Sequence, residues 1–310
     1  MLGLIWSYLK RTRKIPFGPL SLTFKFERST VVTRNTGRRS KLLEARHREW
    51  ESNRPDIPNH GPQEQHSEWP SSSPTKPELA LIVGVGPGFG YALSMRLAAE
   101  GMAVILVSRN AKRLDRLVAE IVQSGGFACS YGCDVTNETA VVDLFSMIGR
   151  IHGVPHLVVY SLQNFGRGSV MNSELPAFED GWKHNCLGSF LVSRSAARLM
   201  SPMGRGSIIL IGSTSSIIGR AGHLNLAVGK FGQRALAQVL ARELWPAGIH
   251  VAHMLIDADI REDEGSTHSA TSSNPHQIAE SVLFLHRQPQ TAWTSEMDIR
   301  PWNEKFWEHC

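Results

Sequence analysis

A glycine-rich turn at residues 84–90 constrains the fold of this chain more than any other feature. The apolar run 79–83 leads directly into it, and glycines occupy positions 84, 88 and 90. Backbone without side chains can approach a pyrophosphate closely, and the free N–H groups at the start of a following helix favour an anion. The pattern therefore predicts a strand, a phosphate-facing turn and a helix. A structural turn that merely needs small residues would show the same pattern, so the turn alone is weak evidence.

Apolar runs and amphipathic segments alternate along the rest of the chain. Strands are predicted near 79–83, 103–108, 127–131, 156–161, 207–212, 249–256 and 295–299, and helices near 88–100, 110–124, 137–150, 179–201, 225–245 and 275–287. Continuously apolar runs such as 207–212 are typical of strands that are buried on both faces of a parallel sheet. The alternation predicts an α/β fold, a Rossmann-type doubly wound parallel sheet in one domain over residues 77–310.

The N-terminal residues 1–76 have a different composition. They are rich in Arg, Ser, Pro, His and Glu without an apolar period, so we predict a mostly disordered extension. The chain carries +5 overall and residues 1–50 alone carry +9, which leaves −4 for the remainder. The folded part therefore lacks the basic face of a nucleic-acid-binding protein. Residues 1–14 combine apolar and basic residues without an acid, which is compatible with a mitochondrial presequence; a basic tail without a targeting role is an equal alternative.

Several classes of function find no support in the sequence. No apolar run approaches the roughly 20 residues of a membrane span, so neither a transmembrane helix nor a membrane partner is predicted. Cys129, Cys133, Cys186 and Cys310 show no metal-ligand spacing and suit a reducing compartment. The histidines form no metal motif, and no Gly-x-Ser-x-Gly elbow of a serine hydrolase occurs. We therefore expect no metal, and a location in the cytoplasm, or in the mitochondrial matrix if the N-terminus is a presequence.

Over about residues 78–306 the chain resembles the short-chain dehydrogenase/reductase family. The residues that match the family's cofactor-binding turn and its adenine-lining Asp-Val pair are Gly84, Gly88, Phe89, Gly90, Asp134 and Val135. Asn185 matches the helix asparagine that the family uses to hold a water in a proton relay. The resemblance also implies a homo-oligomer, a dimer or tetramer, that pairs through the helices carrying Asn185 and Lys230.

The catalytic segment departs from that family. Lys230 matches the lysine of the Tyr-x-x-x-Lys motif, which also binds the cofactor, but the tyrosine position holds Leu226. In the family the phenol is the general acid and the lysine lowers its pKa, whereas an alkyl side chain cannot donate a proton. The family's serine, 13 residues before the tyrosine position, corresponds to Ser213; Ser215 or Ser216 takes the role if the loop differs in length. The resemblance is therefore to a divergent branch that lacks the active-site tyrosine.

The end of the second predicted strand bears on the choice of cofactor. NAD-selective dinucleotide folds place an acid there, which accepts hydrogen bonds from the ribose 2′-hydroxyl. This chain has Ser108, Arg109 and Asn110 instead. Arg109 can bind a 2′-phosphate bidentately, and no carboxylate would repel it. The sequence thus favours NADP over NAD, with an arginine that only caps a solvated turn as the alternative.

Two functions follow from these observations. The first is an NADP-dependent oxidoreductase that transfers hydride to or from a carbonyl, hydroxyl or activated C=C group of a small-molecule substrate. Its proton donor, in place of the tyrosine, would be His223, Tyr160, Ser213 with a water, or Lys230. The second, motivated by Leu226, is a catalytically weak or inactive nucleotide-binding regulatory protein.

Overall fold

The computed structural model describes residues 76–260 and 272–302 of the 310-residue chain. The predicted extension 1–76 lies outside these residues except for Lys76, so the presequence hypothesis stays a prediction. Within the described ranges, no helix combines the length and apolar character that crossing a bilayer requires.

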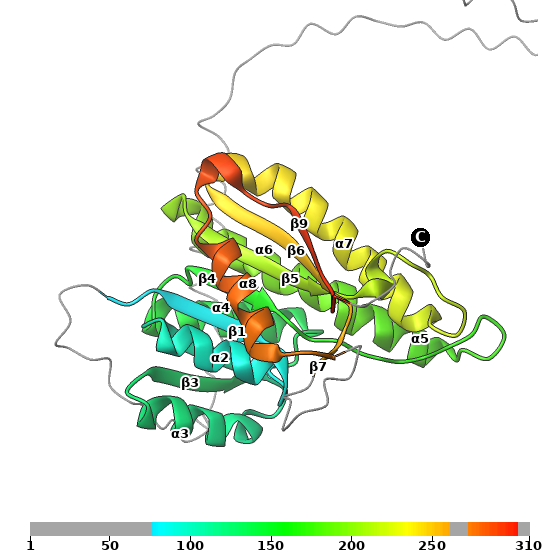
Figure 1. Cartoon of the computed structure of the whole chain (residues 1–310), viewed down its shortest axis with the longest axis horizontal. Coiled ribbons are helices and arrows are strands. Elements are labelled where there is room, and N and C mark those ends of the chain that lie inside the picture. Colours follow the sequence, from blue (N-terminus) through cyan, green and yellow to red (C-terminus); the bar gives the residue numbers. More distant parts are fainter. Residues whose placement is uncertain (1–75, 261–271, 303–310) are drawn as a thin grey trace, which may run out of the picture. The chain divides into compact units, whose positions relative to one another are not determined.

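A seven-stranded sheet forms the centre of the fold, in the order β3-β2-β1-β4-β5-β6-β9 (Figure 1). Its strands are β1 Leu79–Val83, β2 Ala103–Ser108, β3 Phe127–Gly132, β4 Leu157–Tyr160, β5 Gly206–Gly212, β6 Ile249–Ile256 and β9 Glu296–Ile299. All neighbouring strands in it are parallel. Two short strands, β7 Asp259–Ile260 and β8 Ser272–Ser273, pair separately. The predicted doubly wound parallel sheet is confirmed.

Helices cover both faces of the sheet (Figure 1). They are α2 Phe89–Ala99, α3 Asp115–Gln123, α4 Glu138–Ile151, α5 Leu175–Trp182, α6 Gly188–Met200, α7 Leu224–Leu244 and α8 Pro275–His286. Alternate residues of β1 belong to two separate cores, Leu79 and Leu81 to one and Ala80 and Ile82 to the other. The first core packs against α4, α6 and α7 and the second against α2, α3 and α8, as expected for a strand buried on both faces.

The strand order places a ligand crevice at the carboxyl ends of β1 and β4. The chain runs from β1 outward through β2 to β3, then returns to β4 on the other side of β1. Connections that leave these two strands in opposite directions open a crevice between them, where ligands bind in sheets of this kind. The glycine turn follows β1 directly into that crevice.

The predicted helix 179–201 is interrupted. It begins earlier, at Leu175, and residues Lys183–Leu187 form a single π-helical turn between α5 and α6. The turn contains Asn185, whose side-chain amide donates to the carbonyl of Gly181, 2.9 Å away. Short π-helical segments of this kind occur frequently at functional sites.

The glycine turn allows a first test of this architecture. Gly84 has φ +89°, and a Cβ atom there would lie 2.4 Å from the backbone nitrogen of Leu162, which follows β4. Gly101 has a similar φ of +87° but open space around it. We expect Gly101→Ala to lower the free energy of unfolding by about 1 kcal/mol through backbone strain alone, and Gly84→Ala by about 3 kcal/mol because overlap is added. Urea unfolding measures both changes. Equal losses of stability in the two variants would contradict the close approach of the glycine turn to the backbone at Leu162.

Candidate functional site

The glycine turn brings backbone groups to the carboxyl end of β1. The N–H of Gly84 donates to the carbonyl of Val107, 3.0 Å away, and Gly88 is the N-cap of α2. A Cβ atom on Gly90 would lie 2.9 Å from Cα of Val85, so the helix begins in contact with the turn. The side chain of Phe89 is buried in the core beside α2. Only the backbone of Phe89 is thus left to meet a phosphate.

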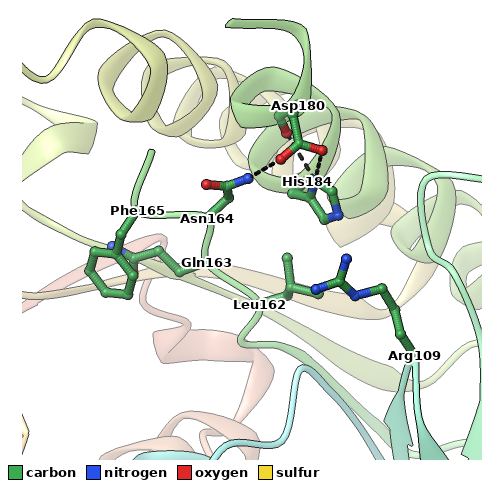
Figure 2. A pocket seen from close by; sticks show the side chains of 7 residues that line it. All are labelled: Arg109, Leu162, Gln163, Asn164, Phe165, Asp180 and His184. Atoms are coloured by element: carbon green, nitrogen blue, oxygen red, sulfur yellow. Dashed lines mark hydrogen bonds and ion pairs between the residues drawn. The ribbon is translucent and has the colours of Figure 1, made fainter. Parts of the chain in front are cut away.

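A pocket of about 290 Å³ lies beside this turn (Figure 2). Its lining residues are Arg109, Leu162, Gln163, Asn164, Phe165, Asp180 and His184. They come from the segments after β2 and β4, the strands on either side of β1, and from α5 with its π-helical turn. The pocket therefore lies at the crevice that the strand order predicts.

Asp134 and Val135 follow β3. Val135 is buried, whereas Asp134 is exposed and accepts hydrogen bonds from the backbone N–H and the hydroxyl of Thr136, at 3.0 and 2.7 Å. These two bonds hold the pKa of the Asp134 carboxyl below its usual value, and the nearby His184 and Arg109 lower it further. Asp134 thus lies within electrostatic range of two side chains of the pocket.

Asn185 holds the segment after β4 in place. Its side chain is fully buried; the amide oxygen accepts from the N–H of Asn164 and the amide nitrogen donates to the carbonyl of Asn164, both at 3.1 Å. With the bond to Gly181, every hydrogen-bonding group of this amide except one lone pair has a backbone partner. The side chain of Asn185 thus positions the wall of the pocket, and its relay role stays a prediction.

Lys230 lies in the interior on α7, with no exposed surface. Its Nζ donates to the carbonyl of Ile211, 2.8 Å away, and to Oε1 of Gln233, 3.1 Å away. Burial disfavours the charged ammonium and lowers the pKa of Lys230 to about 7. A lysine with that pKa can both release and regain a proton near neutral pH.

A buried histidine that the sequence analysis did not single out lies close to Lys230. His253, on β6, is 1% exposed, and a Cβ on Gly212, next to Ile211, would lie 2.2 Å from its Nε2. Burial lowers the pKa of His253 to about 4; the charge of Lys230 contributes, and Glu296, 3.5 Å from Nδ1, acts in the opposite direction. Its place, with His250, among the apolar residues of β6 is the signal that could have identified it.

Ser213 and Leu226 flank Lys230 on adjoining elements. The short 3-10 turn Thr214–Ser216, which Ser213 precedes, packs against α7. The hydroxyl of Ser216 accepts from the N–H of Ser213 at 3.1 Å, whereas Oγ of Ser213 is buried without a hydrogen-bond partner among the described residues. Leu226 is 6% exposed, one helical turn before Lys230. The geometry favours Ser213 over Ser216 as the serine whose hydroxyl is available.

Two other candidate proton donors are engaged elsewhere. Tyr160, at the end of β4, is completely buried and its hydroxyl donates to the carbonyl of His184. Burial raises the pKa of Tyr160 far above its usual value. His223 precedes α7, with Nδ1 3.2 Å from the carbonyl of Ala221. Among the described residues, neither side chain forms a hydrogen bond with Lys230.

The thiols of two cysteines have raised pKa values. Burial raises the pKa of Cys129 to about 12 and that of Cys133 to about 11, so both stay protonated thiols. Cys310 lies outside the described residues. Between residues 76 and 302, leaving out 261–271, no group of three or more His, Cys, Asp or Glu side chains is placed to hold a metal ion.

Comparisons with known proteins agree with this arrangement. The model of the short chain dehydrogenase family matches residues 78–260. A (3R)-3-hydroxyacyl-CoA dehydrogenase of Canis lupus familiaris is 35% identical over 194 residues, 57% of this chain and 72% of the relative. Sorbitol-6-phosphate 2-dehydrogenase of Escherichia coli is 31% identical over 182 residues, covering 58% and 70%.

Solved structures of similar proteins share this fold. A short-chain dehydrogenase from Rhodopseudomonas palustris superposes with a TM-score of 0.66 at 32% identity, over 73% of this chain and 99% of that one. A metagenomic short-chain oxidoreductase solved in complex with NADP has a TM-score of 0.65 at 26% identity, over 72% and 96%.

Proposed function

We propose that this chain, which belongs to the short-chain dehydrogenase/reductase family, is an NADP-dependent oxidoreductase that acts on a carbonyl, hydroxyl or activated C=C group of a small molecule. The oxidoreductase class is that of the matched family and of the relatives' names. The observation that carries the proposal is Lys230, which lies at the position of the lysine in the family's catalytic motif. This lysine is buried on α7, and its pKa is lowered to about 7.

The residues at the crevice fit a dinucleotide. The turn at Gly84–Gly90 provides backbone without Cβ atoms, and Arg109 extends into the adjoining pocket (Figure 2). A guanidinium there suits a 2′-phosphate, and the related metagenomic enzyme was solved with NADP. When bound, the nicotinamide ring supplies or takes up the hydride. This chain's residues bind and orient the cofactor and move the proton.

We assign the proton transfer to Lys230. When a carbonyl is reduced, the alkoxide that forms needs a proton, and the phenol that would donate it is replaced by Leu226. Nζ of Lys230 is partly protonated at neutral pH and can release that proton, since its pKa is lowered to about 7. Ser213, whose hydroxyl has no hydrogen-bond partner among the described residues, would hold the substrate oxygen. For an activated C=C group, protonation by water after hydride transfer would suffice.

A nucleotide-binding regulatory role is the second candidate. The residue that favours it is Leu226, a buried alkyl side chain at the position where the resemblance to the family implies the proton donor. Such a protein would bind NADPH without consuming it. A panel of aldehydes, ketones and enones separates the two functions, because only the enzyme would oxidise NADPH faster than a variant that lacks both Arg109 and Lys230.

Cofactor selectivity is the first experiment we would make. We expect NADPH to bind with micromolar affinity and NADH about 10-fold or more weakly, because a charge-assisted contact to the 2′-phosphate contributes about 1.5–3 kcal/mol. Arg109→Ala should lower the affinity for NADPH and leave the affinity for NADH unchanged. Fluorescence titration measures all four affinities, with Arg113→Ala, on the neighbouring 3-10 turn Ala111–Leu114, as the charge-matched control. Equal affinities for NADPH and NADH would contradict the assignment to Arg109, and no binding of either would refute the proposed function.

We also propose that the chain forms a homo-oligomer through the helices that carry Asn185 and Lys230. Large apolar side chains are exposed on α5, α6 and α7. They are Leu175, Trp182, Phe190, Val228, Phe231 and Val239, each between 37% and 66% exposed. Apolar side chains gathered on neighbouring helices mark surfaces that another protein covers.

A further inference from the structure

The pocket beside Arg109 contains a second side chain that can carry positive charge. We propose that His184 binds the 2′-phosphate of NADP together with Arg109, and that Asp180 holds the imidazole in the orientation this requires. The inference rests on the proposed function, because it concerns the same cofactor. It assigns part of the cofactor selectivity to a residue of the π-helical turn, far in sequence from the segment after β2.

The imidazole of His184 is fixed by hydrogen bonds on one side only. Its Nδ1 lies 2.9 Å from the carbonyl oxygen of Asp180 and 3.0 Å from the carboxylate oxygen Oδ1 of the same residue. Both partners are acceptors, so Nδ1 carries the hydrogen and donates it. None of the hydrogen bonds of the described residues involves Nε2, which would donate to an anionic ligand in the imidazolium form. Figure 2 shows the imidazole and the guanidinium of Arg109 extending towards the same space.

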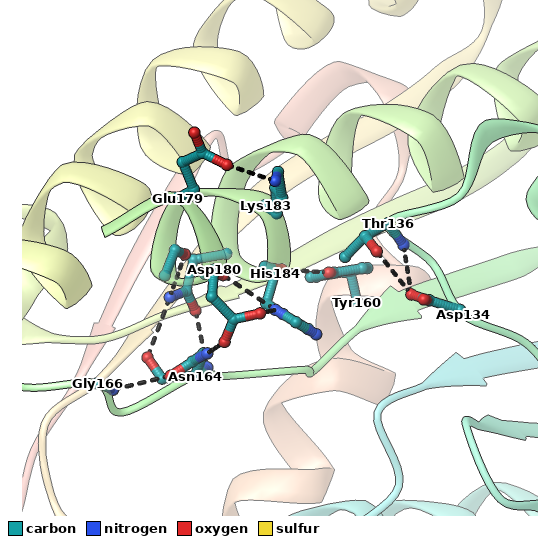
Figure 3. Close-up of polar contacts among 11 residues, drawn as sticks. Asp134, Thr136, Tyr160, Asn164, Gly166, Glu179, Asp180, Lys183 and His184 are labelled. Atoms are coloured by element: carbon teal, nitrogen blue, oxygen red, sulfur yellow. Dashed lines mark hydrogen bonds and ion pairs between the residues drawn. The ribbon is translucent and has the colours of Figure 1, made fainter. Parts of the chain in front are cut away.

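The anchor of this imidazole is itself held in place (Figure 3). The other carboxylate oxygen of Asp180 accepts from the side-chain amide of Asn164, 2.5 Å away. The backbone carbonyl of His184 accepts from the hydroxyl of Tyr160, and Asn185 holds the backbone of Asn164. A side chain fixed through this many contacts is pre-organised, so it loses little conformational freedom when a ligand binds.

Two side chains of the pocket, Arg109 and His184, offer nitrogen atoms to one region. Arg109 and His184 both act electrostatically on the carboxyl of Asp134, which places all three side chains around one region. Asp180 and Asp134 are the carboxylates nearby, and both are occupied by hydrogen bonds, with His184 and Asn164 and with Thr136. A phosphate monoester carries about −1.5 to −2 charges at neutral pH and accepts several charge-assisted hydrogen bonds. Two converging donors therefore serve it better than one.

Binding of two nucleotides tests the contact between His184 and the 2′-phosphate without an enzyme assay. Adenosine 2′,5′-bisphosphate carries the 2′-phosphate and adenosine 5′-monophosphate lacks it. We would titrate each into the full chain by calorimetry at pH 6. His184→Gln should lower the affinity for the bisphosphate about 10-fold or more and that for the monophosphate less than 3-fold. Asp180→Asn, which keeps the imidazole but removes its anionic anchor, should weaken the bisphosphate severalfold.

Lys183→Gln is the matched control. Lys183 precedes His184 on the same π-helical turn but pairs with Glu179, 2.7 Å away, and does not line the pocket. The Lys183→Gln substitution should leave both affinities unchanged. An effect equal to that of His184→Gln would mean that the bisphosphate responds to long-range electrostatics rather than to a direct contact, and would overturn the proposal. Equal weakening of both nucleotides by His184→Gln would overturn it as well, since His184 would then contact only the adenosine. If the wild-type chain bound neither nucleotide, the proposed function itself would fail.

Discussion

Replacing Leu226 with tyrosine should raise the rate of carbonyl reduction by about 10²–10⁴-fold, the usual contribution of a positioned general acid. Residue 226 lies four positions before Lys230 on α7, so both side chains project from the same face of the helix. The hydroxyl of Ser213, buried without a partner among the described residues, would gain one. Lys230 would lower the pKa of the new phenol, as the lysine does in the family.

Steady-state oxidation of NADPH with a panel of aldehydes and ketones measures the effect. Gln238→Tyr adds the same phenol to an exposed position of α7 and should change nothing. Leu226 is 6% exposed, so the larger tyrosine ring could destabilise the fold and thereby prevent a gain in activity. Thermal unfolding detects that case. A stable Leu226→Tyr variant that binds NADPH and gains no activity would contradict the site as we have assigned it.

Lys230→Met should lower the activity by about 10²–10⁴-fold while the fold becomes no less stable. Methionine matches the length of the lysine stem and has no charge to desolvate. The unfolded chain holds the proton of Lys230 up to its ordinary pKa of 10.5, whereas the folded chain releases it at about 7. Between these values the unfolded state binds more protons, so wild-type stability should rise with pH, by at most about 1.4 kcal/mol per pH unit.

The comparison between wild type and Lys230→Met isolates this contribution. Urea unfolding of both proteins at pH 7, 8, 9 and 10 should show the difference in stability shrinking as the pH rises. Cysteines titrate in the same range, but they do so equally in both proteins and therefore cancel. A difference that stays constant across this range would contradict the lowered pKa of Lys230 in the folded protein.

Much of the fold was predictable because parallel strands buried on both faces leave a local signature. The runs at 79–83 and 249–256 have the same bounds as β1 and β6 in the structure. The interruption at Lys183–Leu187 was not predictable. It is accompanied by hydrogen bonds from Tyr160 to His184 and between Asn164 and Asn185. These partners lie more than 20 positions apart, so no local pattern reveals them.

The sequence by itself determined which chemical groups are available: glycines in the turn after β1, an arginine and no carboxylate after β2, a lysine on α7 and an alkyl side chain where a phenol was expected. Only the tertiary structure decided what these groups can do. It buried Lys230 with Nζ bonded to the carbonyl of Ile211 and within electrostatic range of His253, left the hydroxyl of Ser213 without a partner among the described residues, and brought His184 into the pocket of Arg109. Burial and electrostatic coupling depend on side chains from separate strands and helices, and these meet only when the whole sheet has formed.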